Sequence, residues 1–172
     1  MPARRDSGPD SYVVSAGPAA RVAVGWMEEA AVQARLATCR QARCGAIITQ
    51  GDLIIGRGFN HPPAHLEDQR MCGAERGLGK PGYDSTCCVH AEWAAIMDAR
   101  RATDFVATTL WFTRVDAEGI LLLSGPPFCT VCSRLALDCD IEWFALWHPT
   151  GITKYRTDYY NKLSYAYRHP TG

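Results

Sequence analysis

The sequence predicts an α/β sandwich in which helices pack on a mixed β-sheet. Helix-type and strand-type hydrophobic patterns alternate along the chain, as they do in sheets covered by helices. The chain has 172 residues, 47% of them hydrophobic and 21% charged, so one domain with a substantial core is expected. Gly8-Pro9 and Gly17-Pro18 interrupt regular structure, so we expect a flexible N-terminal arm over residues 1–17 and a single domain over residues 18–172.

The first predicted elements are a long amphipathic helix and a β-hairpin. Apolar residues recur at spacings of three and four, which predicts a helix over residues 18–38 with Pro18 at its first position. Two β-rich runs follow at residues 44–49 and 53–59, and Gln50-Gly51-Asp52 supplies a turn between them. Residues 60–87 show no period, and long loops of this kind are usually functional.

The second half of the chain continues the alternation. In chain order we expect a helix over residues 89–100, a strand over 105–114, a helix over 129–139, a strand over 141–147 and a helix over 155–167. The longest uninterrupted apolar runs, such as residues 143–147, are far shorter than the roughly 20 residues of a membrane span.

Charge and cysteine content limit the classes of function. Eighteen Lys and Arg residues offset eighteen Asp and Glu residues, which argues against a broad electrostatic grip on nucleic acid. The first 15 residues lack the apolar core of a secretory signal, so we expect a cytoplasmic protein. Disulfides are disfavoured in that compartment, and the eight cysteines are then available for metal binding or chemistry.

Two short motifs at the starts of predicted helices carry the chemistry. They are Cys88-Val89-His90-Ala91-Glu92 and Pro126-Pro127-Phe128-Cys129-Thr130-Val131-Cys132. Cys129 and Cys132 face the same side of a first helical turn, and with His90 they offer three zinc ligands. The fourth position stays open for water, as in catalytic zinc sites, and zinc lowers the pKa of that water toward neutrality. Glu92 can take the proton and hand it to a leaving group, so it is the candidate catalytic residue.

These motifs, in this order and about 40 residues apart, match the H-x-E…P-C-x-x-C signature of zinc nucleobase deaminases. The chain resembles the cytidine/deoxycytidylate deaminase superfamily, and within it the deoxycytidylate-deaminase-like branch. The resemblance runs from about Val24 to Trp147. It includes residues 44–48 and 54–60, which look like the first hairpin of the family and end in its Gly-aromatic-Asn triplet.

The resemblance implies a fold and a role for each matching residue. The fold would be a three-layer α/β/α sandwich with a five-stranded mixed sheet. His90, Cys129 and Cys132 would bind zinc, and Glu92 would be the proton shuttle. Asn60 stands where the family places a substrate-contacting asparagine, and the backbone N–H of Ala91 would bind the carbonyl of the base.

The chain departs from the family pattern in two places. Phe128 separates Pro127 from Cys129, although the family usually has proline directly before the first cysteine of the pair. Residues 116–125 also lengthen the connection between the strand and the helix of the cysteine pair. Both changes lie beside the expected base pocket, so they bear on the substrate rather than on the reaction type.

The remaining cysteines are candidates for a second site. By resemblance, Cys39, Cys72 and either Cys87 or Cys88 could hold a structural zinc that orders the long loop. The alternative is that these are ordinary buried thiols. His61 and His65 could complete such a site or face the substrate, whereas Cys44 and Cys139 are expected in the core.

The reaction expected from these features is zinc-dependent hydrolytic deamination of a small pyrimidine nucleotide or nucleoside, with release of ammonia. This would make the protein a hydrolase acting on a cyclic amidine, with a nucleotide or base as partner, no membrane contact and a homo-oligomer compatible with the family. Two alternatives stay open: deamination of a base in RNA or DNA or of another small heterocycle, and a non-catalytic module with structural zinc. A structural site would close the fourth zinc position with another Cys or His.

Overall fold

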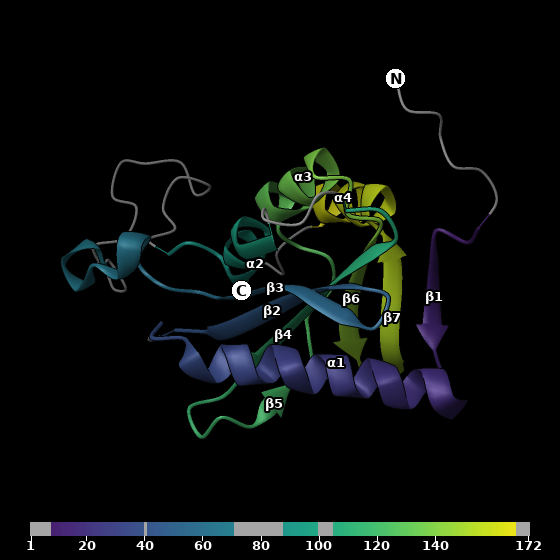
Figure 1. Ribbon diagram of the computed structural model, residues 1–172, viewed down its shortest axis with the longest axis horizontal. Coiled ribbons are helices and arrows are strands. Elements are labelled where there is room, and N and C mark those ends of the chain that lie inside the picture. Colours follow the sequence, from purple (N-terminus) through teal and green to yellow (C-terminus); the bar gives the residue numbers. More distant parts are fainter. Residues whose placement is uncertain (1–7, 40, 71–87, 100–104, 168–172) are drawn as a thin grey trace.

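The computed structural model describes residues 8–39, 41–70, 88–99 and 105–167, and Figure 1 shows their arrangement. Its elements are β1 (Ser11–Val14), α1 (Gly17–Leu36), β2 (Arg43–Gln50), β3 (Leu53–Phe59), two 3₁₀ turns (Pro63–His65 and Glu67–Gln69), α2 (Ala91–Ala99), β4 (Thr108–Val115), β5 (Leu121–Leu122), α3 (Thr130–Asp138), β6 (Trp143–His148), β7 (Gly151–Arg156) and α4 (Thr157–Ala166). Among the described residues, no helix has the length and hydrophobicity that crossing a membrane requires.

The strands form one mixed sheet in the order β1-β7-β6-β4-β2-β3, with β5 paired to β4. The pair β4 and β6 is parallel, and the other pairs are antiparallel. The hairpin predicted from the turn residues is therefore confirmed as β2 and β3, and the strands expected over 105–114 and 141–147 are β4 and β6.

The sheet has seven strands within the described ranges rather than the five expected, because β1 and β5 extend it. Strand β1 pairs with β7 from Ser11↔Tyr155 to Val14↔Ile152. The expectation of a flexible arm is thus wrong for residues 11–14, since the hydrogen bonds to β7 hold them in the sheet. Strand β5 arises from the lengthened connection at 116–125 and pairs with the end of β4.

Helices cover both faces of the sheet, which confirms the three-layer class. Helix α1 packs on one face, against β2 and β4, while α2, α3 and α4 lie on the other (Figure 1). Successive side chains of β2 point to opposite faces of the sheet and so contribute to the core on each face. Ile47 packs with Met27 of α1, and Ile48 packs with Ala95 and Ile96 of α2.

Glycines bring two of these helices close to the sheet. A Cβ on Gly45 would lie 2.1 Å from the Ala30 carbonyl oxygen of α1. On the opposite face, a Cβ on Gly58 would lie 2.2 Å from the Ala95 nitrogen and 2.4 Å from the Ala91 carbonyl oxygen. These positions have room only for hydrogen, so the glycines set the depth at which α1 and α2 rest on the hairpin.

The C-terminal segment differs in part from its prediction. A helix was expected over residues 155–167, but α4 begins at Thr157, and the preceding residues form β7. Tyr160 of α4 stacks on Phe144 of β6, with ring centroids 4.0 Å apart. Residues 60–70 contain only two 3₁₀ turns, and residues 71–87 of the long loop lie outside the described ranges.

Candidate functional site

A cleft of about 430 Å³ opens over the central strands of the sheet, where α2 and α3 begin. Its walls include residues from β2, β4, β6, the two helix starts and α4. Every site residue expected from the sequence except the buried Cys132 lines it, namely Asn60, His90, Ala91, Glu92 and Cys129. The volume lies within the range of small-molecule sites.

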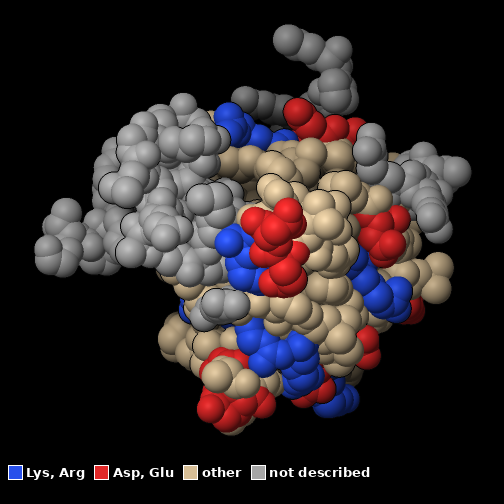
Figure 2. All heavy atoms as spheres, turned by 90° about the vertical axis from the view of Figure 1, so that its left-hand side faces the viewer, with Lys and Arg blue, Asp and Glu red and all other residues tan. Residues whose placement is uncertain are grey.

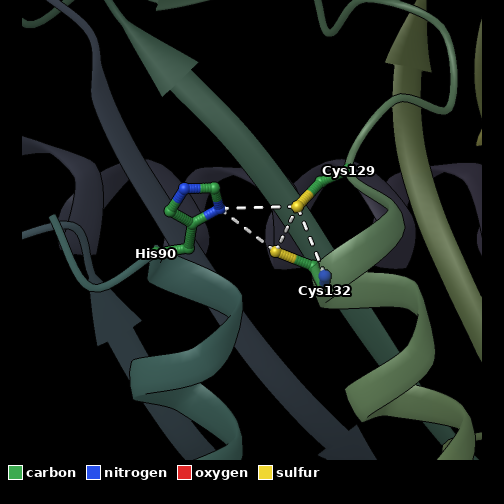
Figure 3. A group of neighbouring side chains, drawn as sticks. All are labelled: His90, Cys129 and Cys132. Atoms are coloured by element: carbon green, nitrogen blue, oxygen red, sulfur yellow. Dashed lines mark hydrogen bonds between the residues drawn. The ribbon is translucent and has the colours of Figure 1, made fainter. Parts of the chain in front are cut away.

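Two helix starts bring three metal-ligating side chains together. His90 directly precedes α2, Cys129 is the N-cap of α3, and Cys132 lies in the first turn of α3. Figure 3 shows the three side chains pointing toward one another across the gap between these helices. His90 Nδ1 lies 3.2 Å from Cys132 Sγ and 3.5 Å from Cys129 Sγ, and the two sulfurs are 2.7 Å apart.

The approach to α2 fixes His90 in this position. Val89 forms an isolated antiparallel bridge with His61, in which the Val89 N–H donates to the His61 carbonyl at 2.8 Å and the His61 N–H donates in return at 3.3 Å. The bridge ties the residue before His90 to the segment that follows β3. These two hydrogen bonds therefore fix the backbone immediately before His90 and help to position its imidazole.

The chemistry of this donor set fits zinc. One imidazole nitrogen and two thiol sulfurs, all within 4.8 Å of one another, are the ligand types and the number found in catalytic zinc sites. Within the described part of the chain, this group has no fourth Cys, His, Asp or Glu ligand. Three protein ligands leave a position for water, which is the arrangement a catalytic site needs rather than a structural one.

The cluster favours a thiolate even without metal. The hydrogen bond with Cys132, followed by that with His90, lowers the pKa of Cys129 to about 4. The same contact with Cys129 raises the pKa of His90 to about 9, while burial raises the pKa of Cys132 well above its usual value. Thiolate is the form that ligates metals, so one sulfur is already charged for binding.

Glu92 is buried beside the metal-ligating group. It lies in the first turn of α2, has only 5% of its surface exposed and lines the cleft. Burial, and next the charge on Cys129, raise the pKa of its carboxyl to about 7. A carboxyl with a pKa near neutrality can both accept and donate a proton, which is what a general acid–base group requires.

Asn60 and Ala91 occupy the cleft wall in different ways. The Asn60 side-chain carbonyl accepts from the Cys44 N–H at 2.8 Å, and its amide donates to the Ala42 carbonyl at 2.8 Å. These bonds lock the amide against the start of β2 and leave it one N–H for a ligand. Ala91 is the first residue of α2, where backbone N–H groups have no partner within the helix.

The cleft also contains residues that sequence reasoning did not select. Phe112 and Arg114 reach it from β4, Leu146 from β6 and Tyr160 from α4. Alternation along β4 places Leu110, Phe112 and Arg114 on one face, but the pattern alone does not reveal that this face carries the site. Phe128 lines the cleft, is 57% exposed and packs edge-to-face on Tyr167 at 5.0 Å.

The expected second metal site has no support in the described residues. Cys39 and Cys88 both line the cleft, but the described residues contain no second group of three metal ligands. Cys72 and Cys87 lie outside the described ranges. His61 and His65 stack on each other with ring centroids 3.9 Å apart. As expected, Cys44 and Cys139 pack against the core.

The fold and the ligand group together define an α/β/α protein with a three-ligand candidate zinc site. The family model described as the cytidine and deoxycytidylate deaminase zinc-binding region matches residues 22–144, and the chain belongs to this family. This confirms the resemblance inferred from the two motifs and the hairpin.

Individual relatives agree with this assignment. The chain is 28% identical over 120 residues to the deoxycytidylate deaminase of Mycobacterium phage D29, covering 66% of this chain and 84% of that one. Its fold is similar to the crystal structure of dCMP deaminase from cyanophage S-TIM5 in apo form (TM-score 0.52, 16% identity, 75% of this chain and 82% of that one). The same cyanophage enzyme in complex with dCMP and dUMP gives a TM-score of 0.53 at 18% identity, over 75% of this chain and 81% of that one.

Proposed function

We propose that the protein catalyses the zinc-dependent hydrolytic deamination of a small pyrimidine nucleotide or nucleoside of the deoxycytidylate type, releasing ammonia. The observation that carries the proposal is a buried glutamate in a cleft, two residues after a histidine that meets two cysteines. Membership of the family and the dCMP complex of the cyanophage relative support the same chemistry.

His90, Cys129 and Cys132 would hold the zinc ion. Zinc bound there would supply Lewis-acid chemistry, lowering the pKa of water so that it can attack the amino-bearing carbon of the base. Glu92 would take one proton from the attacking water and deliver it to the ring nitrogen, and would then move the remaining proton of the new hydroxyl group to the departing amino group. The net reaction consumes one water and releases one ammonia, leaving a carbonyl on the ring.

The remaining cleft residues would bind and orient the base. The Ala91 N–H would donate to the carbonyl of the pyrimidine, and the remaining N–H of Asn60 would contact the sugar. Phe112 and Leu146 give the sheet side of the cleft an apolar surface on which a ring can lie. Burial of Glu92 keeps bulk water away from the proton being transferred.

The charge distribution favours a small substrate over a polynucleotide. The chain has equal numbers of basic and acidic residues. On the face shown in Figure 2, the coloured Lys and Arg side chains are interspersed with Asp and Glu rather than gathered into one basic tract. Polynucleotide deaminases need a positively charged channel for the strand.

A substrate panel with metal analysis on the same sample tests the proposal. We expect about one zinc per chain and ammonia release from deoxycytidylate or deoxycytidine, with free purine bases as comparison substrates. Stoichiometric zinc without ammonia from any cytosine compound would contradict the proposed function.

A further inference from the structure

We infer that Arg114 binds the phosphate of the substrate and thereby makes the protein select a pyrimidine nucleoside monophosphate over the corresponding nucleoside. The inference rests on the proposed function and narrows its substrate class. It concerns a residue outside the His90, Cys129, Cys132 and Glu92 group.

Arg114 lies on the same row of the sheet as Asn60. In the register of the sheet, Arg114 of β4 is the partner of Cys44 in β2. Asn60 bonds to Cys44 from the other side, through its backbone N–H at 3.2 Å and its side chain at 2.8 Å. Strands are about 4.8 Å apart, so the backbones of Arg114 and Asn60 are about 10 Å apart. Both residues line the cleft, and a ligand that touches Asn60 is within reach of an arginine side chain.

The guanidinium of Arg114 is positioned but not satisfied by the described residues. Its Nη2 donates to the Leu123 carbonyl at 3.3 Å, and its Nε is buried without a hydrogen-bond partner there. A guanidinium carries five N–H donors, and the buried Nε donor has no acceptor among the described residues. A buried donor without a partner is costly, which makes a ligand that accepts its hydrogen bonds favourable.

The described protein groups near Arg114 do not neutralise it. Arg114 takes no part in the ion pairs within the described ranges, which join Arg70 to Glu67 and Arg156 to Asp158. Burial raises the pKa of neighbouring Cys44 to about 12, so that residue stays a neutral thiol. A half-buried cation on the wall of a largely apolar cleft favours the binding of an anionic ligand.

Phosphate is the anion that matches this group. Its oxygens accept the parallel hydrogen bonds of a guanidinium fork, which gives both energy and orientation. Leu123, whose carbonyl accepts the hydrogen bond from Arg114, belongs to residues 116–125, where the chain departs from the family pattern. We infer that this longer connection helps to hold the arginine side chain against the cleft.

The test compares a nucleotide with its nucleoside in matched variants. We would measure kcat/KM for deoxycytidylate and deoxycytidine with the wild type, Arg114→Gln, Arg114→Lys and Arg21→Gln. Arg21 lies exposed on α1, on the opposite face of the sheet, and controls for the loss of one positive charge. A charge-assisted hydrogen bond predicts that Arg114→Gln lowers kcat/KM for deoxycytidylate by about 10- to 150-fold. Deoxycytidine turnover should not change, Arg114→Lys should recover part of the loss, and Arg21→Gln should behave as wild type.

Product binding separates this inference from the proposed function. Calorimetry with dUMP and deoxyuridine needs no turnover, and Arg114→Gln should weaken dUMP binding without changing deoxyuridine binding. If the wild type deaminates neither substrate, the proposed function fails, and the calorimetric comparison still decides the role of Arg114. An equal loss for nucleotide and nucleoside in Arg114→Gln, or no loss in a folded variant, would overturn the inference.

Discussion

Glu92 lies in the first turn of α2, two residues after His90, and is a buried residue that lines the cleft. Burial raises the pKa of its carboxyl and of the Cys132 thiol, whereas hydrogen bonds with Cys132 and His90 lower the pKa of Cys129. The protonation state of each of these side chains therefore depends on its neighbours. Removing one of the proposed ligands should lower metal binding more than it lowers the stability of the fold.

Replacing one thiol ligand should remove zinc from the protein. Cys132→Ser substitutes a weaker oxygen ligand in a buried position, so we expect the zinc content measured by atomic spectroscopy to fall well below that of the wild type. Cys139→Ser is the matched control, since Cys139 packs against the core away from the ligand group and should leave the zinc content unchanged. Wild-type zinc content in Cys132→Ser would remove this cysteine from the ligand set.

Helix placement determines whether these residues meet. The starts of α2 and α3 lie side by side on one face of the sheet (Figure 3), and α2 can approach β3 only because Gly56 and Gly58 have no side chains. On Gly56 a Cβ would lie 2.4 Å from the Ala95 carbonyl oxygen. The glycines of β3 therefore influence the site, since α2 carries Glu92 and begins directly after His90.

Adding one methyl group under α2 should lower the stability of the fold. We expect Gly58→Ala to lower the free energy of unfolding in urea by about 1–3 kcal/mol, because α2 must move to relieve the overlap. Gly25→Ala is the control: no atom lies within 4 Å of its Cβ position in α1, and alanine should raise helix stability by about 0.5–1 kcal/mol. Equal stability of Gly58→Ala and wild type would contradict the close packing of α2 on β3.

For the whole molecule, the sequence predicted the layers and the proximity of His90, Cys129 and Cys132 better than the edges of the sheet. The stripe of α1 and the turn at Gln50-Gly51-Asp52 are strong local signals, and both predictions are confirmed. Strands β1 and β5 contain four and two residues, which is too short for a period-two pattern to be recognised. Strand β1 forms because β7, far away in the sequence, offers it a partner, whereas β5 pairs with the nearby end of β4.

The residues of the site also divide into those that a local sequence pattern indicates and those that it does not. His90, Cys129 and Cys132 could be selected because their motifs lie at helix starts, where short spacings fix direction. Arg114 could not, because its place in the cleft depends on the pairing of β4 with β2, whose residues are about 70 positions away in the chain. Residues supplied by long-range pairing carry no local signature.

We propose that this fold holds a catalytic zinc with Glu92 as its proton-transferring group. The most direct measurement is ammonia release from deoxycytidylate by Glu92→Gln and wild type, with the zinc content of both preparations determined. Glu28→Gln, an exposed change on α1, is the control for the loss of a carboxylate. We expect Glu92→Gln to keep its zinc and to lose turnover by about 100-fold or more. A zinc-loaded Glu92→Gln variant with wild-type turnover would rule out proton transfer by Glu92.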